Sequence, residues 1–81
     1  ERFVIVYDVA GTNPTDIPAV RAPVPGGPGA VALGGLFAAL AARGSLEGMV
    51  VTEFEPELDP NGTAAMALVR ILCRALQSRL A

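Results

Sequence analysis

The order of two strand-like runs and two helix-like runs constrains the fold of this chain more than any other feature. Residues 3–7 read FVIVY and residues 48–54 read GMVVTEF, and both are rich in the β-branched and aromatic side chains typical of strands. A helical pattern over residues 30–44 separates them, and a longer one follows over residues 63–80. A helix between two strands of one sheet implies parallel strands joined by a right-handed crossover. The predicted fold class is therefore α/β, with a βαβα segment.

A parallel sheet of two strands is too small to be stable by itself. The chain has 81 residues, which is enough for one domain, and a compact chain of this size buries only about 60–65% of its unfolded surface. The unbroken apolar run of residues 3–7 predicts a strand that is covered on both faces. Since two parallel strands cannot cover their own faces and edges, we expect them to complete a larger sheet. Further chain, a partner subunit or a symmetric copy could supply the rest.

Composition limits the partners and the chemistry. The net charge is −2 and the six basic residues, all arginine, are scattered, so neither nucleic acid nor an anionic membrane is expected as a partner. The apolar run of residues 30–42 is shorter than the roughly 20 residues that cross a bilayer. The amino terminus lacks a secretory pattern, and the single cysteine, Cys73, excludes an internal disulfide. We therefore expect a soluble, cytoplasmic protein. Without histidine, the chain lacks the commonest general base and metal ligand.

Two carboxylates follow the predicted strands. Asp8 comes directly after the first strand, and Glu53 lies at the end of the second. The carboxyl ends of parallel strands meet at one edge of a sheet, where α/β folds collect ligands. Adjacent strands lie about 4.8 Å apart, so both carboxylates can face one pocket. Strand ends are also often polar simply because they reach water, and spacing alone favours that simpler interpretation.

Two stretches of the sequence together point to a known family. Residues 4–27, VIVYDVAGTNPTDIPAVRAPVPGG, resemble the segment of ureohydrolases in which a strand ends in Asp-x-Asp-x-x-Asp-Pro and a loop ending in Pro-Gly-Gly follows. Residues 50–65, VVTEFEPELDPNGTAA, resemble the family's next strand, its glutamate and the start of its last helix. The family includes arginases, agmatinases and formimidoylglutamases, and the sequence of the first stretch is most similar to a bacterial arginase-like branch. The resemblance covers residues 1–81 but only the C-terminal part of such an enzyme.

The resemblance implies a three-layer α/β/α fold and a manganese-dependent hydrolase. Such an enzyme cleaves a linear amidine or guanidino C–N bond with two Mn ions and acts on a small guanidino substrate, and we expect it to be a homo-oligomer. Asp8 falls on a manganese ligand, since carboxylate oxygens suit that ion. Glu53 falls on the glutamate that contacts the substrate, where a carboxylate can pair with a planar guanidinium through two hydrogen bonds. No catalytic residue is assigned to this chain.

The sequence departs from the family pattern at two positions of the first motif. Ala10 stands where the second aspartate ligand is expected, and a methyl group cannot coordinate a metal. Asn13 replaces the third acid but keeps a turn-capping side chain before Pro14. The family's remaining metal ligands would lie upstream of this chain. We therefore expect an impaired metal site, and no catalysis by these 81 residues alone.

Two other interpretations remain open. The chain could be part of a non-catalytic, degenerate subunit that uses the fold for assembly, as Ala10 suggests. It could also be a small α/β domain of unrelated function, in which case Asp8 and Glu53 would not share a pocket.

Smaller features have structural interpretations. The acid-rich run of residues 53–59 is typical of a solvated turn. The glycines of PGGPG, residues 25–29, would allow the backbone to approach the pocket rim closely. Thr63 is the expected N-cap of the last helix, and Cys73 is expected to be a core thiol. Gly44 is expected to end the first helical segment in a left-handed conformation, and the Gly34-Gly35 pair is expected to allow tight packing of that helix.

Overall fold

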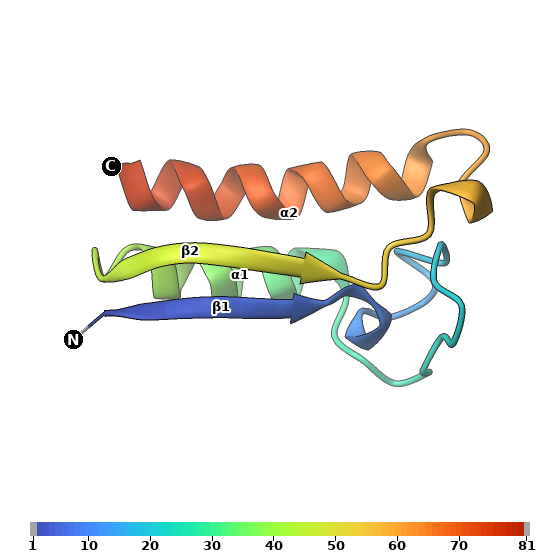
Figure 1. The fold of residues 1–81 in the computed structure, drawn as a ribbon, viewed down its shortest axis with the longest axis horizontal. Helices are drawn as coiled ribbons and strands as arrows, with labels where there is room; N and C mark the ends of the chain where they lie inside the picture. Colours follow the sequence, from blue (N-terminus) through green and yellow to red (C-terminus); the bar gives the residue numbers. More distant parts are fainter. Residues whose placement is uncertain (1, 81) are drawn as a thin grey trace.

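The computed structural model describes residues 2–80 and has the predicted order of elements. Its regular elements are β1 (Phe3–Asp8), α1 (Ala30–Ala41), β2 (Leu46–Thr52) and α2 (Thr63–Leu80), with short 3₁₀ turns η1 (Val9–Gly11) and η2 (Pro56–Leu58). In Figure 1 both strands run in the same direction, and the long loops gather at their carboxyl ends. The α/β class and the βαβα order are therefore confirmed. No helix in the described part of the chain is long and apolar enough to cross a membrane.

The register of the two strands fixes which residues share the carboxyl edge of the sheet. β1 pairs with β2 in parallel, from Val4 opposite Gly48 to Asp8 opposite Thr52. The second strand begins and ends two residues earlier than the predicted range of 48–54. It ends at Thr52 because Glu53 has a φ of 72°, which is incompatible with an extended strand. Glu53 therefore lies just after the strand.

The core lies between one face of the sheet and the two helices. Tyr7 of β1 contacts Phe37 of α1 edge to face, with 5.1 Å between the ring centroids. The two helices pack closely at Gly34, where an added Cβ would lie 3.3 Å from Cδ of Arg74. The glycine pair of the first helix was predicted to allow such packing. The main core side chains of the four elements are Ile5, Tyr7, Leu33, Phe37, Leu46, Leu68 and Ile71.

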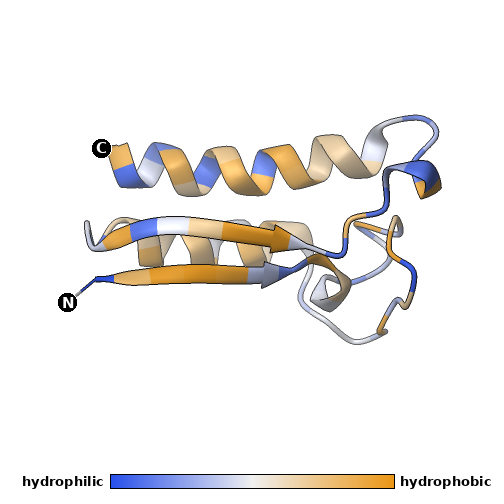
Figure 2. Cartoon of the chain, in the orientation of Figure 1, coloured by the Kyte–Doolittle hydropathy of each residue, from blue (hydrophilic) through white to orange (hydrophobic). Residues whose placement is uncertain are grey.

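The other face of the sheet is open within residues 2–80. Val4 is 54% exposed, Val6 72% and Val50 48%, although Figure 2 shows both strands to be mostly hydrophobic. The prediction that the first strand is covered on both faces is thus not met by this chain itself, because its side chains alternate between buried and exposed. An apolar sheet face of this kind is typical of a surface that packs against other protein.

The ends of the helices differ in detail from the sequence predictions. α1 ends at Ala41 rather than at residue 44, and Gly44 has the expected left-handed conformation, with φ at 78°. Thr63 is the first residue of α2 and not its cap.

Asp59 caps α2 instead, because its carboxylate has two acceptor atoms for two amides of the first helical turn. Its Oδ1 accepts from the N–H of Ala64 at 3.0 Å, and its Oδ2 accepts from that of Ala65 at 2.8 Å. Cys73 is exposed on α2, so the prediction of a core thiol is wrong. The buried positions of that helix include Leu68, Ile71 and Ala75, and the cysteine is turned away from them.

Candidate functional site at the carboxyl edge of the sheet

The parallel strands place the two predicted site residues at the same edge of the sheet. Asp8 is the last residue of β1 and lies opposite Thr52, and Glu53 follows Thr52 directly. Both carboxylates are exposed. The expectation of a common edge is therefore confirmed. Their convergence on one pocket, and their roles toward a metal and a substrate, stay predictions.

Local hydrogen bonds fix the turn that follows Asp8. Oδ1 of Asp8 accepts a hydrogen bond from the backbone N–H of Ala10 at 2.9 Å and so caps η1. Further along, Oδ1 of Asn13 accepts from the N–H of Thr15 at 3.0 Å. The turn-capping role predicted for Asn13 is therefore confirmed.

A buried polar pair ties the same turn to the core. The hydroxyl of Tyr7 and Oγ1 of Thr12 form a hydrogen bond, and both residues are almost fully buried. Burial raises the pKa of Tyr7, and the hydrogen bond to Thr12 opposes part of that rise. Each of these two buried hydroxyls is the hydrogen-bond partner of the other. The bond therefore ties Thr12, in the turn after Asp8, to the side chain of Tyr7 in β1.

The proline- and glycine-rich loop packs directly against the turn. A Cβ at Gly27 would lie 2.2 Å from the carbonyl oxygen of Gly11, closer than any side chain permits. The N–H of Asn13 donates to the carbonyl of Pro28 at 2.8 Å. Asp16 then caps α1, since its Oδ2 accepts from the N–H of Ala30 at 2.8 Å. The close backbone approach predicted for this loop is therefore confirmed.

A second set of contacts joins the loop after β1 to the segment after β2. The N–H of Glu55 donates to the carbonyl of Ala19 at 2.8 Å. The guanidinium of Arg21 binds two carboxylates: its Nε lies 2.8 Å from Oε1 of Glu55, and its Nη2 lies 2.9 Å from Oε1 of Glu57. We call these three side chains the Arg21 clamp. The two glutamates of the clamp lie two and four residues after Glu53 in the sequence.

Sequence reasoning missed the Arg21 clamp. Residues 53–59 were predicted to be a solvated turn. Glu53 and Glu57 are exposed as expected, but Glu55 is half-buried beside Arg21 and Asp59 is half-buried as the cap of α2. One signal was available, because Arg21 is the only basic residue between Arg2 and Arg43. The pKa of Glu57 lies below its usual value because of a backbone hydrogen bond at Glu57 itself, a hydrogen bond with the Glu55 side chain and the charge of Arg21.

The described residues do not fit a two-metal centre by themselves. Within residues 2–80 no group of three or more His, Cys, Asp or Glu side chains is placed to hold a metal ion. Asp8 offers one carboxylate, and Ala10 offers none. Any metal bound at this edge would therefore need ligands from outside the described part of the chain.

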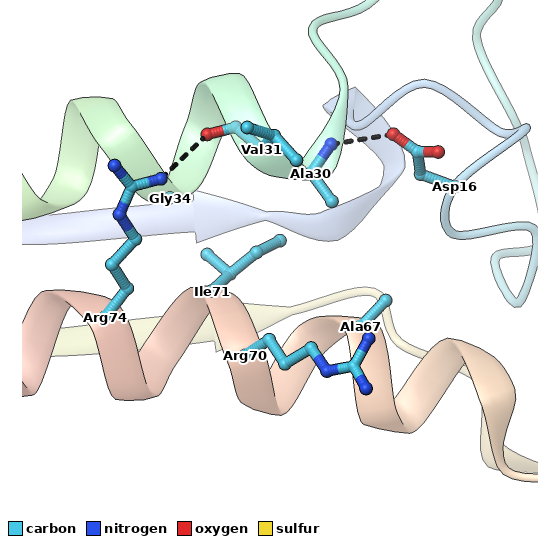
Figure 3. Close-up of a pocket in the computed structure, with 8 residues that line it drawn as sticks. All are labelled: Asp16, Ala30, Val31, Gly34, Ala67, Arg70, Ile71 and Arg74. Carbon is cyan, nitrogen blue, oxygen red and sulfur yellow. Dashed lines mark hydrogen bonds between the residues drawn. The ribbon is translucent and has the colours of Figure 1, made fainter.

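A hollow of about 320 Å³ lies between α1 and α2 (Figure 3). Arg70 and Arg74 border it, and Nη1 of Arg74 donates to the carbonyl of Val31 at 3.3 Å. Neither Asp8 nor Glu53 lines this hollow.

Comparisons with known proteins identify relatives of this fold. A model of the arginase family matches residues 1–77. Among solved structures, formimidoylglutamase from Bacillus subtilis superposes with a TM-score of 0.88 at 23% identity, over 96% of this chain and 24% of that one. Agmatine ureohydrolase from Thermoplasma volcanium has a TM-score of 0.86 at 30% identity, over 98% and 26%. Arginase from Bacillus subtilis has a TM-score of 0.84 at 24% identity, over 93% and 28%.

The chain thus spans about a quarter of the length of these structures. A search of curated proteins gave no match.

Proposed function

This chain belongs to the arginase family, and we propose that it forms the C-terminal part of a ureohydrolase that cleaves a linear C–N bond in a guanidino or related substrate. The observation that carries the proposal is the match of the family to residues 1–77, together with the parallel register that places Asp8 beside the Thr52–Glu53 step. Because the chain spans about a quarter of its solved relatives, catalysis requires the rest of the protein.

Glu53 is the proposed substrate-binding residue of this chain. Its carboxylate is exposed at the carboxyl edge of the sheet, where α/β folds bind their ligands. A carboxylate can accept two parallel hydrogen bonds from a planar guanidinium, and such charge-assisted pairs are among the strongest hydrogen bonds in proteins. The role requires the Glu53 carboxylate to be held in one direction, which the geometry of the following segment favours.

Asp8 is the proposed metal ligand of this chain, in an impaired site. Manganese prefers hard oxygen donors such as its carboxylate. A bound metal would polarise the substrate and supply a nucleophile at neutral pH. Oδ1 of Asp8 already accepts the N–H of Ala10, and the methyl group of Ala10 adds no donor. We therefore propose that metal binding in the full protein is weaker than a complete ligand set would give.

Metal-dependent release of urea or ammonia by the full protein tests the enzymatic proposal. We expect release from guanidino substrates after loading with manganese, and a loss of release after chelation. Ala10→Asp should increase the number of bound metal ions, measured by elemental analysis of the dialysed protein. Ala10→Ser is the matched control, because it adds a polar group without a carboxylate. Full protein that releases nothing under any loading would refute the enzymatic proposal.

A non-catalytic subunit is the second candidate, and one observation favours it. Ala10 stands where the family pattern has a carboxylate ligand, whereas the apolar sheet face formed by Val4, Val6 and Val50 would need cover in either case. In this case the fold would serve assembly, and the full protein would bind no stoichiometric metal. Elemental analysis separates the candidates, since two bound ions per chain support the enzyme and none supports the scaffold.

The proposed setting of either candidate is the cytoplasm, in a homo-oligomer. The rest of the ureohydrolase chain, or a partner subunit, would cover the apolar sheet face. Sedimentation of the full protein tests the oligomer, and a monomer at micromolar concentration would contradict it.

A further inference from the structure

Glu53 has an unusual backbone conformation. Its φ of 72° makes it the only non-glycine residue with a positive φ among residues 2–80. Such a conformation is uncommon for residues with a Cβ and costs free energy. It persists only where the surrounding structure holds it in place, and it concentrates at functional sites. The contacts around Glu53 therefore show what maintains it.

The segment after Glu53 is held from the opposite loop at three points. Two residues on, the N–H of Glu55 donates to the carbonyl of Ala19 at 2.8 Å. Arg21 binds the side chains of Glu55 and Glu57 at 2.8 Å and 2.9 Å through two different nitrogens of one guanidinium. The Glu55 side chain is only 20% exposed, whereas that of Arg21 is 70% exposed. Glu55 is thus the anchored partner of the pair.

From this geometry we propose that Arg21 is a positioning residue that keeps Glu53 in its left-handed conformation and so directs its carboxylate. The inference rests on the proposed function, in which that carboxylate binds the substrate's guanidinium. Arg21 fixes the backbone two residues beyond Glu53 by holding Glu55. It also forms ion pairs with both neighbouring carboxylates, so that within residues 2–80 Glu53 is the acid of residues 53–57 that is exposed and in no ion pair.

The planar fork of arginine is required for this role. Its nitrogens can bind two carboxylates at once with fixed directions, whereas the lysine ammonium is a flexible point charge. We therefore expect Arg21→Lys to keep part of the effect and Arg21→Gln to lose it. Arg43→Gln is the matched control, because Arg43 is an exposed arginine in the connection between α1 and β2, at the opposite edge of the sheet.

Amide hydrogen exchange of the full protein tests the clamp without any need for activity. The N–H of Glu55 should exchange about two- to tenfold faster in Arg21→Gln than in the wild type, as expected for the loss of exposed ion pairs. Arg21→Lys should fall between the two, and Arg43→Gln should leave the rate unchanged. An unchanged rate in Arg21→Gln would overturn the inference.

A double-mutant cycle on the full enzyme tests positioning against a merely structural role. Arg21→Gln should raise KM for the guanidino substrate about two- to tenfold with a smaller effect on kcat. In the Glu53→Gln background the same change should have no further effect on KM, because Arg21 acts through Glu53. An equal effect in both backgrounds would show a general structural role and overturn the inference.

The two proposals fail in different ways. If the enzyme is active but Glu53→Gln leaves KM unchanged, the proposed role of Glu53 fails, and the exchange rate of the Glu55 amide alone decides whether Arg21 holds this turn. If the full protein is inactive, the enzymatic proposal fails and the same exchange measurement still decides the inference.

Discussion

Replacing Gly27 by alanine should loosen the whole carboxyl edge of the sheet. The new Cβ would lie 2.2 Å from the carbonyl oxygen of Gly11 and 3.4 Å from the backbone N of Asn13. Both contacts are to backbone atoms, so no side chain can rotate away to make room. The two loops would have to separate by roughly an ångström, which a close-packed structure resists.

Two effects contribute to the loss of unfolding free energy in Gly27→Ala. Forcing an extra methyl group into a packed site costs about 1–3 kcal/mol. Separation of the loops also weakens the hydrogen bond from the N–H of Asn13 to the carbonyl of Pro28, which is 2.8 Å long and is worth about 1 kcal/mol. We therefore expect Gly27→Ala to lower the free energy of unfolding by about 2–4 kcal/mol.

Urea denaturation of the full protein, followed by circular dichroism, measures this change. Gly11→Ala is the matched control, because Gly11 belongs to the same contact, has no atom within 4 Å of its added Cβ and has no positive φ. That control should leave the unfolding free energy the same or raise it by about 0.5–1 kcal/mol. If Gly27→Ala unfolds at the same urea concentration as the wild type, the close approach of the two loops does not exist in solution.

Two further predictions concern other groups near the same edge. Tyr7→Phe should lower the free energy of unfolding by about 1–3 kcal/mol, because it leaves Oγ1 of Thr12 buried without its partner. In urea denaturation the double variant Tyr7→Phe/Thr12→Val should recover most of this loss. A double variant as unstable as Tyr7→Phe would contradict the pairing. The depressed pKa of Glu57 means that its ionised form stabilises the fold fully above the usual value of 4.5, and that this stabilisation is lost as the pH falls through the lower folded pKa. Glu57→Gln should therefore show a smaller decrease in unfolding free energy between about pH 5 and pH 3 than the wild type, and identical pH profiles would count against the shift.

The architecture was predictable because local patterns and topology agree. The β-branched runs, the helical spacing and the handedness rule for crossovers leave one arrangement, with parallel strands and a shared carboxyl edge. Gly44 marks the end of the first helical segment by its left-handed conformation, as the sequence suggested. The cover of the strands was not predictable from their composition, since an apolar run such as residues 3–7 shows only that both faces prefer burial. Within residues 2–80 Val4 and Val6 on the second face remain exposed.

The details of the site depended on contacts between residues far apart in the sequence. Asp8 and Asn13 make bonds to amides two residues away, so their turn roles could be read from local spacing. Arg21 meets Glu55 and Glu57 across more than thirty residues, and nothing in the local pattern of either segment pairs them. The positive φ of Glu53 could not be predicted from residue propensities either, because glutamate rarely adopts that conformation.

The hydrogen bonds of the turn after β1 do not involve the side chain of residue 10. The turn is held by the backbone N–H of Ala10, by the pair of Tyr7 and Thr12 and by the cap at Asn13. An alanine at this position is therefore compatible with the turn, whatever chemistry a carboxylate there would supply. Ala10 is half-buried and packs against the core, so the converse change, Ala10→Asp, should lower the unfolding free energy by about 0.5–3 kcal/mol. Ala10→Ser gives the baseline for a polar group at this position, and metal uptake above that baseline can be attributed to the carboxylate itself.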